Sequence, residues 1–396
     1  MKNLLRPFAA AAFAVALALA ATAESPSHRG AEPGRLVIVG GALADSNAAI
    51  YRAILDARLG NGPFCIFPTA AATPDSAIDG PVKAFEKYVG PGTVKGILIS
   101  SAKPESARDP AVVAQISACS GFFFVGGVQS RVVTAFRPDG KPTPAYDALM
   151  ARWREGAVVS GSSAGAAIMS DPMIAGGTSA GAIVRGVRRT TVAASDSNES
   201  TSGVTITTGL GFFPSALADQ HFLARARFGR LLVALLDLDQ FDLAFGIDEN
   251  TALVVEGGVV WNPGLSDVVI MDERPARREG KSATGVRVHL MGAGDRFDLA
   301  TRTLTINPDK TPLPRTVSRE SIDAPKDVFA RWELLHLLDR FARVSQTELA
   351  VPVDGGQLVI HKDAGFRAVA RNGAGVQGTP AGLAMTGLSF DLRRAP

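Results

Sequence analysis

Two serines of this chain stand in the same G-x-S-x-G frame, a spacing that can present a hydroxyl for nucleophilic attack. Ser163 lies in GSSAG at 161–165, and Ser179 lies in GTSAG at 177–181. The frame serves catalysis where a strand turns sharply into a helix, because that turn lifts the side chain above the sheet. An apolar run precedes Ser163 and predicts such a strand, whereas two glycines precede Ser179 and predict a flexible turn. We expect Ser163 to be the nucleophile; the alternative is that these small residues only allow close packing.

A serine nucleophile needs a base, and His221 is the best candidate in the sequence. It stands in the run DQHFLARARF, whereas His336 lies in an amphipathic stretch and is expected to pack there. An imidazole can take the serine proton and return it to the leaving amine. Glu249 follows an apolar run and is the first candidate for the acid that orients the imidazole, with Asp248 and Asp219 as competitors.

Three arginines, Arg225, Arg227 and Arg230, follow His221 within a few positions. The apolar spacing after them predicts a helix that begins near Ala226. Cations are unfavourable at a helix N-terminus, because the helix dipole is positive there. A guanidinium also fits a carboxylate in two-pronged fashion. The arginines therefore predict an anionic partner, and the alternative is that they are ordinary solvated charges.

The elements that must position these side chains alternate along the first part of the chain. Short apolar runs are typical of strands buried on both faces, and amphipathic stretches between them predict helices. This alternation predicts a parallel sheet covered by helices on both faces, with the site at the carboxyl ends of its strands. The predicted strands lie at 36–39, 64–67, 97–100, 122–125 and 157–160, and the predicted helices at 47–59, 81–89, 109–118 and 143–153.

The pattern changes toward the C-terminus. The sequence predicts an α/β domain over 35–261 and a β-rich α+β extension over 262–396, to which it assigns no chemistry. The polar run at 195–203 predicts a surface loop. The extension has strand-like pieces at 268–271, 286–290 and 357–361 around one amphipathic helix at 326–344, in which Phe329, Trp332, Leu335 and Phe341 can share a face.

The first 23 residues resemble a secretory signal peptide. Lys2 and Arg6 precede an apolar run that ends in Ala-Thr-Ala, which predicts cleavage after Ala23 and a linker over 24–34. The alternative, a membrane anchor, fits less well because the run is shorter than the roughly 20 residues of a spanning helix. The sequence thus predicts a secreted or periplasmic protein with no membrane contact after cleavage.

Composition limits the partners that the mature chain can have. The full sequence has 46% hydrophobic and 20% charged residues, a balance typical of a packed globular protein. Loss of Lys2 and Arg6 lowers the formal charge from +3 to +1, which gives no field for nucleic acid. The five histidines lack the spacing of metal ligands, so no metal or cofactor is expected. Cys65 and Cys119 lie in or beside apolar runs and are expected to be buried thiols.

From about Arg35 to Val255 the chain resembles the S51 serine peptidases, which include cyanophycinases and aspartyl dipeptidases. Four motifs carry this resemblance in the family's order, and the DQHF-x-x-R-x-R-x-x-R run is more similar to the cyanophycinases. The motifs are FFFVGGVQ at 122–129, GSSAGAAIMSDPMI at 161–174, DQHFLARARFGRLL at 219–232 and GIDENTAL at 246–253.

The resemblance implies a role for each matching position. Ser163 becomes the nucleophile, His221 the base and Glu249 the third member of the triad. The backbone N–H groups of Gly127 and Ala164 become the oxyanion hole. The substrate pocket is then lined by Gln129, Asp219, Gln220, Arg225, Arg227 and Arg230.

The resemblance also implies a fold and an activity. The fold is an αβα sandwich of the flavodoxin-like, class I glutamine amidotransferase-like kind, and members of the family often form homodimers. The activity is hydrolysis of cyanophycin, a poly-aspartate that carries arginine on its side chains, to β-Asp-Arg dipeptides. Two other readings stay open: a peptidase of the same family that acts on another isoaspartyl or Asp-containing peptide, and an inactive protein that binds carboxylates.

Overall fold

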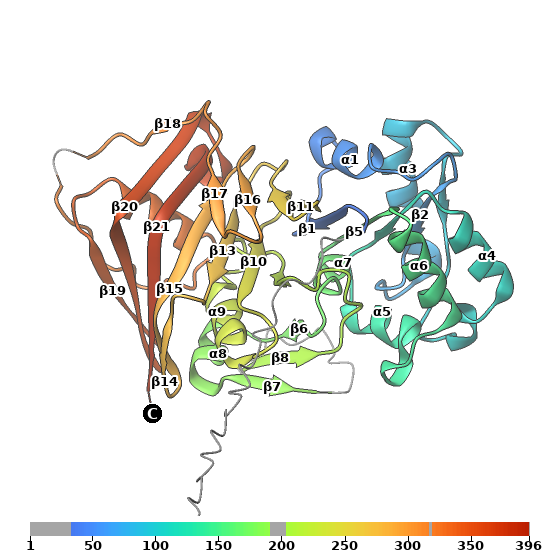
Figure 1. Ribbon diagram of the computed structural model, residues 1–396, viewed down its shortest axis with the longest axis horizontal. Helices are drawn as coiled ribbons and strands as arrows, with labels where there is room; N and C mark the ends of the chain where they lie inside the picture. The colour runs from blue at the N-terminus through green and yellow to red at the C-terminus, as the bar shows by residue number, and fades with distance from the viewer. Residues whose placement is uncertain (1–32, 191–202, 317–318, 396) are drawn as a thin grey trace, which may run out of the picture.

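The computed structural model describes residues 33–190, 203–316 and 319–395 (Figure 1). The expected signal peptide, all but the end of the linker and nearly all of the polar run at 195–203 lie outside the described residues. Two large sheets and the helices around them make up the described chain, and they are bridged by a small third sheet.

The first sheet has the predicted parallel core. Strand β1 pairs in parallel with β5, β5 with β4, β4 with β2 and β2 with β3, whereas β11 adds to the other side of β1 in antiparallel fashion. In spatial order its strands are β17 (Thr303–Thr305), β16 (Arg296–Asp298), β12 (Val259–Trp261), β11 (Ala252–Glu256), β1 (Leu36–Val39), β5 (Val158–Ser162), β4 (Gly121–Phe124), β2 (Phe64–Phe67) and β3 (Val94–Gly96).

Helices cover both faces of this parallel core, as the sequence predicts. Buried side chains of β1, β2 and β4 alternate between the two faces: Phe123 packs with α1 and α3, whereas Phe122 and Phe124 pack with α4, α5 and α6. The fold is therefore an αβα sandwich. The helices are α1 (Ala48–Leu55), α2 (Pro74–Ala77), α3 (Asp79–Val89), α4 (Pro110–Ala118), α5 (Gln129–Phe136), α6 (Pro144–Arg154), α7 (Ala164–Ala167), α8 (Ser179–Arg185), α9 (Phe228–Asp237) and α10 (Glu333–Ala342), with short 3₁₀ turns η1 (Pro104–Ala107), η2 (Pro138–Gly140) and η3 (Val376–Gly378).

One predicted strand is displaced. The strand expected at 97–100 lies at 94–96 as β3, and its ladder ends where the Ile97 N–H donates to the Ile66 carbonyl at 2.9 Å. The neighbouring strand β2 itself ends at Phe67, and Pro68 brings no N–H to continue the pairing. Ile97 and Ile99 are buried in a loop instead, whereas Leu98 between them is exposed.

The second sheet joins the C-terminal extension to the α/β part of the chain. Strands β9 and β10 come from before residue 261, and β13 adds to β10 from after it, so the sheet runs across the expected domain boundary. Figure 1 shows this sheet in yellow to red on the left. Its strands in order are β18 (Thr311–Pro312), β20 (Gly356–Ala374), β21 (Pro380–Arg394), β15 (Ser282–Met291), β13 (Val268–Asp272), β10 (Leu243–Ile247) and β9 (Leu217–Asp219), with β14 (Arg277–Glu279) beside β15 and β19 (Glu348–Val353) beside β20.

A small third sheet, formed by β6 (Met173–Gly176), β8 (Val204–Thr207) and β7 (Val187–Arg189), lies under α8 and α9 (Figure 1). The run at 176–184 is thus the end of β6, a two-residue connection at Gly177 and Thr178, and the first part of helix α8. The hydroxyl of Thr178 caps α8 by accepting from the Gly181 N–H at 3.0 Å. This cap stabilises the start of α8.

The helix expected at 326–344 is shorter than predicted. It begins only at Glu333, because Trp332 has a left-handed backbone with φ of 56° and its N–H donates to the Leu223 carbonyl. Before it, the Asp327 carboxylate accepts from the Phe329 N–H and forms a turn. Residues 326–332 are therefore a loop that reaches toward the α/β part of the chain.

The two cysteines form a disulfide, so the expected free thiols are wrong. Cys65 lies in β2 and Cys119 stands just before β4, two neighbouring strands, with the Cα atoms 5.9 Å apart. Among the described residues no helix is long and apolar enough to cross a membrane, and no group of three potential ligands is placed to hold a metal ion.

Candidate active site

Ser163 stands at the corner between β5 and α7. Its backbone has φ of 56° and ψ of −109°, which is rare for a residue other than glycine and costs about 1–3 kcal/mol. The two glycines of its frame are sterically required: a Cβ on Gly161 would lie 2.5 Å from the Gly165 oxygen, and one on Gly165 would lie 2.3 Å from the Phe124 oxygen. This close approach of strand and helix explains the frame, and it leaves the Ser163 hydroxyl partly exposed.

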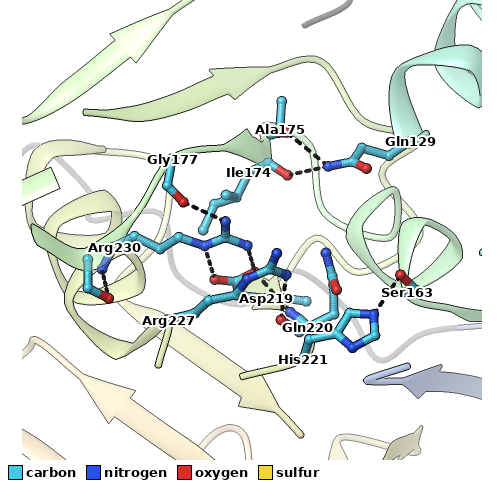
Figure 2. A network of polar contacts seen from close by, with 12 residues as sticks. Gln129, Ser163, Ile174, Ala175, Gly177, Asp219, Gln220, His221, Arg227 and Arg230 are labelled. Carbon is cyan, nitrogen blue, oxygen red and sulfur yellow. Dashed lines mark hydrogen bonds and ion pairs between the residues drawn. The ribbon is translucent and has the colours of Figure 1, made fainter. Parts of the chain in front are cut away.

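His221 faces this hydroxyl from the end of β9. With the imidazole neutral and its proton on Nδ1, the Ser163 hydroxyl donates to Nε2 at 2.9 Å, and Nδ1 donates to Glu249 Oε1 at 2.7 Å. Figure 2 shows the serine and imidazole turned toward each other. The three side chains can therefore move a proton from the serine and stabilise the imidazolium that forms.

Glu249, rather than either competitor, is the carboxylate in contact with His221. Asp248 points away from the imidazole and accepts from the Ala224 N–H, from Ser266 and from Trp332, and it is fully buried. Asp219 binds an arginine instead. Asp248 and Glu249 follow the end of β10 at Ile247, and their side chains bind different partners although they are adjacent.

The backbone around His221 depends on a Gly-Gly pair that the sequence reasoning missed. Gly40 and Gly41 follow β1, and the Gly40 carbonyl accepts from the His221 N–H at 2.6 Å. A Cβ on Gly41 would lie 2.3–2.7 Å from three atoms of the imidazole ring, and its φ is 118°. A repeat in the sequence could have revealed this pair, because both β1 and the strand segment that ends at Val125 are followed by Gly-Gly.

The second of these pairs lies beside the serine. A Cβ on Gly126 would approach the Ser163 Cβ to 3.3 Å and Oγ to 3.8 Å, and Gly127 has φ of 139°. Ala164 follows the serine as the first residue of α7, the place of the backbone donor in sites built on this frame. The oxyanion role of the Gly127 and Ala164 N–H groups remains a prediction.

Burial sets the protonation of the base. The pKa of His221 is lowered from 6.5 to about 4, chiefly by burial and in part by the charges of Arg225 and Arg227, whereas the hydrogen bond and charge of Glu249 act in the opposite direction. The imidazole is therefore neutral near pH 7 and able to accept the serine proton.

Arg230 already has an anionic partner within the protein. Its guanidinium donates to both oxygens of Asp219 at 2.8 and 2.6 Å and to the Gly177 carbonyl at 2.8 Å (Figure 2). Both side chains are about 2–3% exposed, so this is a buried, two-pronged ion pair. The anion that the sequence predicts for Arg230 is Asp219, and the pair holds α9 to the end of β9.

The other predicted pocket residues differ in exposure. Arg225 is exposed, whereas Arg227 is buried and donates to the Gln220 carbonyl at 2.8 Å. Gln129 uses its amide N–H₂ on the Ile174 and Ala175 carbonyls. The side-chain oxygen of Gln220 is buried and has no hydrogen-bond partner among the described residues. An unsatisfied buried acceptor beside His221 is suited to a ligand donor.

Ser179 has a structural task. Its hydroxyl donates to the Ala226 carbonyl at 2.5 Å and accepts from the N–H groups of Gly229 at 3.0 Å and Arg230 at 3.3 Å. It is 3% exposed and thus caps the N-terminus of α9 from a different helix. The hydroxyl of Ser179 is fully used in this cap.

Comparison with known proteins gives the family. No family model matches the chain. It is 31% identical over 250 residues to a cyanophycinase of Nostoc sp., covering 60% of this chain and 76% of that one. To a cyanophycinase of Synechococcus elongatus it is 30% identical over 257 residues, covering 62% and 71%.

A solved structure of a peptidase from an acI-B1 actinobacterium is 21% identical, with a TM-score of 0.47, and covers 67% of this chain and 96% of that one. This last likeness is too distant to support an argument. The Nostoc relative, matched at this identity over most of its length, shows that the chain belongs to the cyanophycinase family of S51 serine peptidases.

Proposed function

We propose that this protein is an exported peptidase that hydrolyses cyanophycin to β-Asp-Arg dipeptides through an acyl-enzyme on Ser163. The observation that carries the proposal is the contact chain from the Ser163 hydroxyl through the imidazole of His221 to Glu249, with distances of 2.9 and 2.7 Å. The choice of substrate is supported by the relatives that are named cyanophycinases.

The chemistry follows from the positions of these groups. Ser163 Oγ attacks a backbone carbonyl carbon of the poly-aspartate while its proton passes to His221 Nε2. The resulting oxyanion accepts from the N–H groups of Gly127 and Ala164, and His221 then gives its proton to the leaving amine. Water attacks the acyl-enzyme by the same proton route and frees the serine. Glu249 keeps the imidazole oriented and stabilises its charged form.

Charge near the imidazole supports a substrate that is rich in carboxylates. The positive charges of Arg225 and Arg227 act on His221, and Arg225 is exposed. The unpartnered oxygen of Gln220 is an acceptor for an N–H of the substrate, either on its peptide or on its guanidinium. A carboxylate-bearing chain with arginine branches meets both requirements, whereas an ordinary peptide meets them only by chance.

The test is hydrolysis of insoluble cyanophycin by the purified protein, with the product identified by mass. We expect clearing of the suspension and β-Asp-Arg as the main product, and no clearing by Ser163→Ala. Release of the residue after Asp from Asp-X peptides, with cyanophycin left intact, would replace this proposal by an aspartyl dipeptidase. Binding of cyanophycin by the wild type without hydrolysis of any isoaspartyl substrate would favour a carboxylate-binding protein.

Export is part of the proposal and is supported by the disulfide between Cys65 and Cys119. Disulfides persist in oxidising compartments, and this one closes a loop across a separation of 54 residues. We expect protein recovered from outside the cytoplasm to begin at Glu24 and to show no free thiol unless it is reduced. An intact N-terminus at Met1 in that fraction would contradict cleavage.

A further inference from the structure

The loop before α10 brings the C-terminal extension against the candidate active site. The Trp332 N–H donates to the Leu223 carbonyl at 2.9 Å, two residues after His221. The ring of Phe329 lies 5.2 Å from that of Phe228, at the start of α9. The loop is therefore fixed to the segment that carries the imidazole.

Trp332 also contacts the residue next to Glu249. Its indole Nε1 donates to Asp248 Oδ2 at 3.0 Å, and Asp248 holds the Ala224 N–H with its other oxygen. Trp332 keeps a left-handed backbone, which is strained for so bulky a residue and persists only where the surroundings enforce it. Here the indole bond and the backbone bond of Trp332 are those enforcing contacts.

Arg331 extends from this fixed point to Glu249. Its guanidinium carbon lies 4.1 Å from the centre of the Trp332 ring, a stacked cation–π arrangement that limits the motion of the side chain. One guanidinium nitrogen lies 3.5 Å from Glu249 Oε2, while Oε1 of the same carboxylate accepts from His221. Glu249 is thus held at both oxygens, by the base on one side and by the extension on the other.

We propose that Arg331 is a positioning residue of the active site: it holds the outer oxygen of Glu249 so that the inner oxygen stays directed at His221. The inference rests on the proposed catalytic role of Ser163, His221 and Glu249. It gives the C-terminal extension a part in catalysis, because the loop that places Arg331 belongs to it.

Exposure decides how large the effect is. The Arg331 side chain is 62% exposed and that of Glu249 21% exposed, so solvent screens their attraction. What distinguishes the pair from an ordinary surface ion pair is the stacked, anchored arginine, which has already lost much of its freedom. We expect Arg331→Met to slow acylation of Ser163 by about two- to fivefold, the range that corresponds to a screened pair.

The assay is labelling of the full-length protein by a fluorophosphonate, followed over time by intact mass. The reagent forms an Oγ–P bond on Ser163, fluoride leaves, and the serine proton passes to His221, so no cyanophycin is required. Arg331→Lys keeps the charge and is expected to recover most of the wild-type rate. Arg340→Met is the matched control, because this arginine of α10 pairs with Glu333 and not with Glu249, and it is expected to label like the wild type.

A double-mutant cycle separates positioning from a general effect on structure. If Arg331 acts through Glu249, Arg331→Met has no further effect on the labelling rate once Glu249 is replaced by Gln. The Glu249→Gln variants are expected to label slowly, so their labelling is followed over hours. The proposal is overturned if the two substitutions slow labelling independently, so that the double variant shows the product of the two single effects. It is also overturned if Arg331→Met labels at the wild-type rate, or if Arg331→Lys labels as slowly as Arg331→Met. If the wild type is labelled but does not hydrolyse cyanophycin, only the proposed substrate is wrong. If the wild type is not labelled at all, both the proposed catalytic role of Ser163 and the role of Arg331 are wrong.

Discussion

The two serines in the same frame are predicted to fail in opposite ways when each is replaced by alanine. Ser179→Ala removes the hydroxyl that satisfies the Ala226 carbonyl and the N–H groups of Gly229 and Arg230 at the start of α9. Ser163→Ala removes a partly exposed hydroxyl that touches only the imidazole in the described contacts. The first change should cost stability, and the second should cost activity.

The size of the stability loss follows from burial of the cap. Loss of a helix cap alone costs about 0.5–2 kcal/mol, and each buried polar group left unsatisfied costs about 1–3 kcal/mol. Ser179 is 3% exposed, so water reaches the freed groups poorly. We therefore expect Ser179→Ala to lower the free energy of unfolding by about 2–4 kcal/mol, more than the loss of an exposed cap. For Ser163→Ala we expect a change within about 0.5 kcal/mol.

Both quantities are measured on the same pair of variants. Urea unfolding followed by circular dichroism gives stability, and the rate of cyanophycin hydrolysis, normalised to the folded fraction, gives activity. Ser163→Ala should lose at least about a thousandfold in rate, whereas folded Ser179→Ala should keep most of it. The assignment is refuted if Ser179→Ala is as stable as the wild type, or if it is folded and inactive while Ser163→Ala remains active.

Three further predictions concern the groups around these serines. The pKa of His221 is lowered from 6.5 to about 4, chiefly by burial, so the base stays neutral as the pH falls through 6.5. The acidic limb of the pH profile of kcat/KM should therefore lie below pH 6.5, and a limb at or above pH 6.5 would contradict this. Gly41→Ala should displace the imidazole and abolish most activity, whereas Gly60→Ala, with φ of 71° and no atom within 4 Å, is the control for backbone strain alone and should stay active. Arg230→Met should cost about 3–5 kcal/mol in urea unfolding, because it leaves the buried carboxylate of Asp219 unpaired; wild-type stability would count against the buried pair.

The sequence predicted those parts of the fold that depend on neighbouring residues. Buried parallel strands are apolar at successive positions, so β1, β2, β4 and β5 were visible as short runs, and the helices between them were visible by their periodicity. The corner at Ser163 was predictable for the same reason, since the strand, the glycines and the helix are contiguous. Which carboxylate reaches His221 was open, because Asp248 and Glu249 are adjacent and only the exit of the chain from β10 separates their directions.

Features that join distant segments were beyond local patterns. The disulfide requires β2 and β4 to be neighbours, and that order comes from the folding of the whole sheet. The Arg230–Asp219 pair was misjudged in a similar way. A cation at a helix N-terminus does indicate an anion, but the sequence cannot tell a substrate carboxylate from one supplied by the end of a neighbouring strand.

Backbone strain shows why the loop of the extension escaped prediction. Among the described residues other than glycine that have positive φ, Ser163, His221, Asn250 and Trp332 are linked by contacts around one imidazole, whereas others, such as Asp139 and Gln377, lie in turns elsewhere. Asn and His tolerate this region better than Ser or Trp. The N–H of each of the four also donates to another segment: to Val39 from Ser163, to Gly40 from His221, to Gly41 from Asn250 and to Leu223 from Trp332. The helical periodicity of 326–344 was a sound local signal that tertiary contacts overrode at Trp332. The strain at Trp332 persists because the contacts of the loop enforce it, and the same loop places Arg331 beside Glu249.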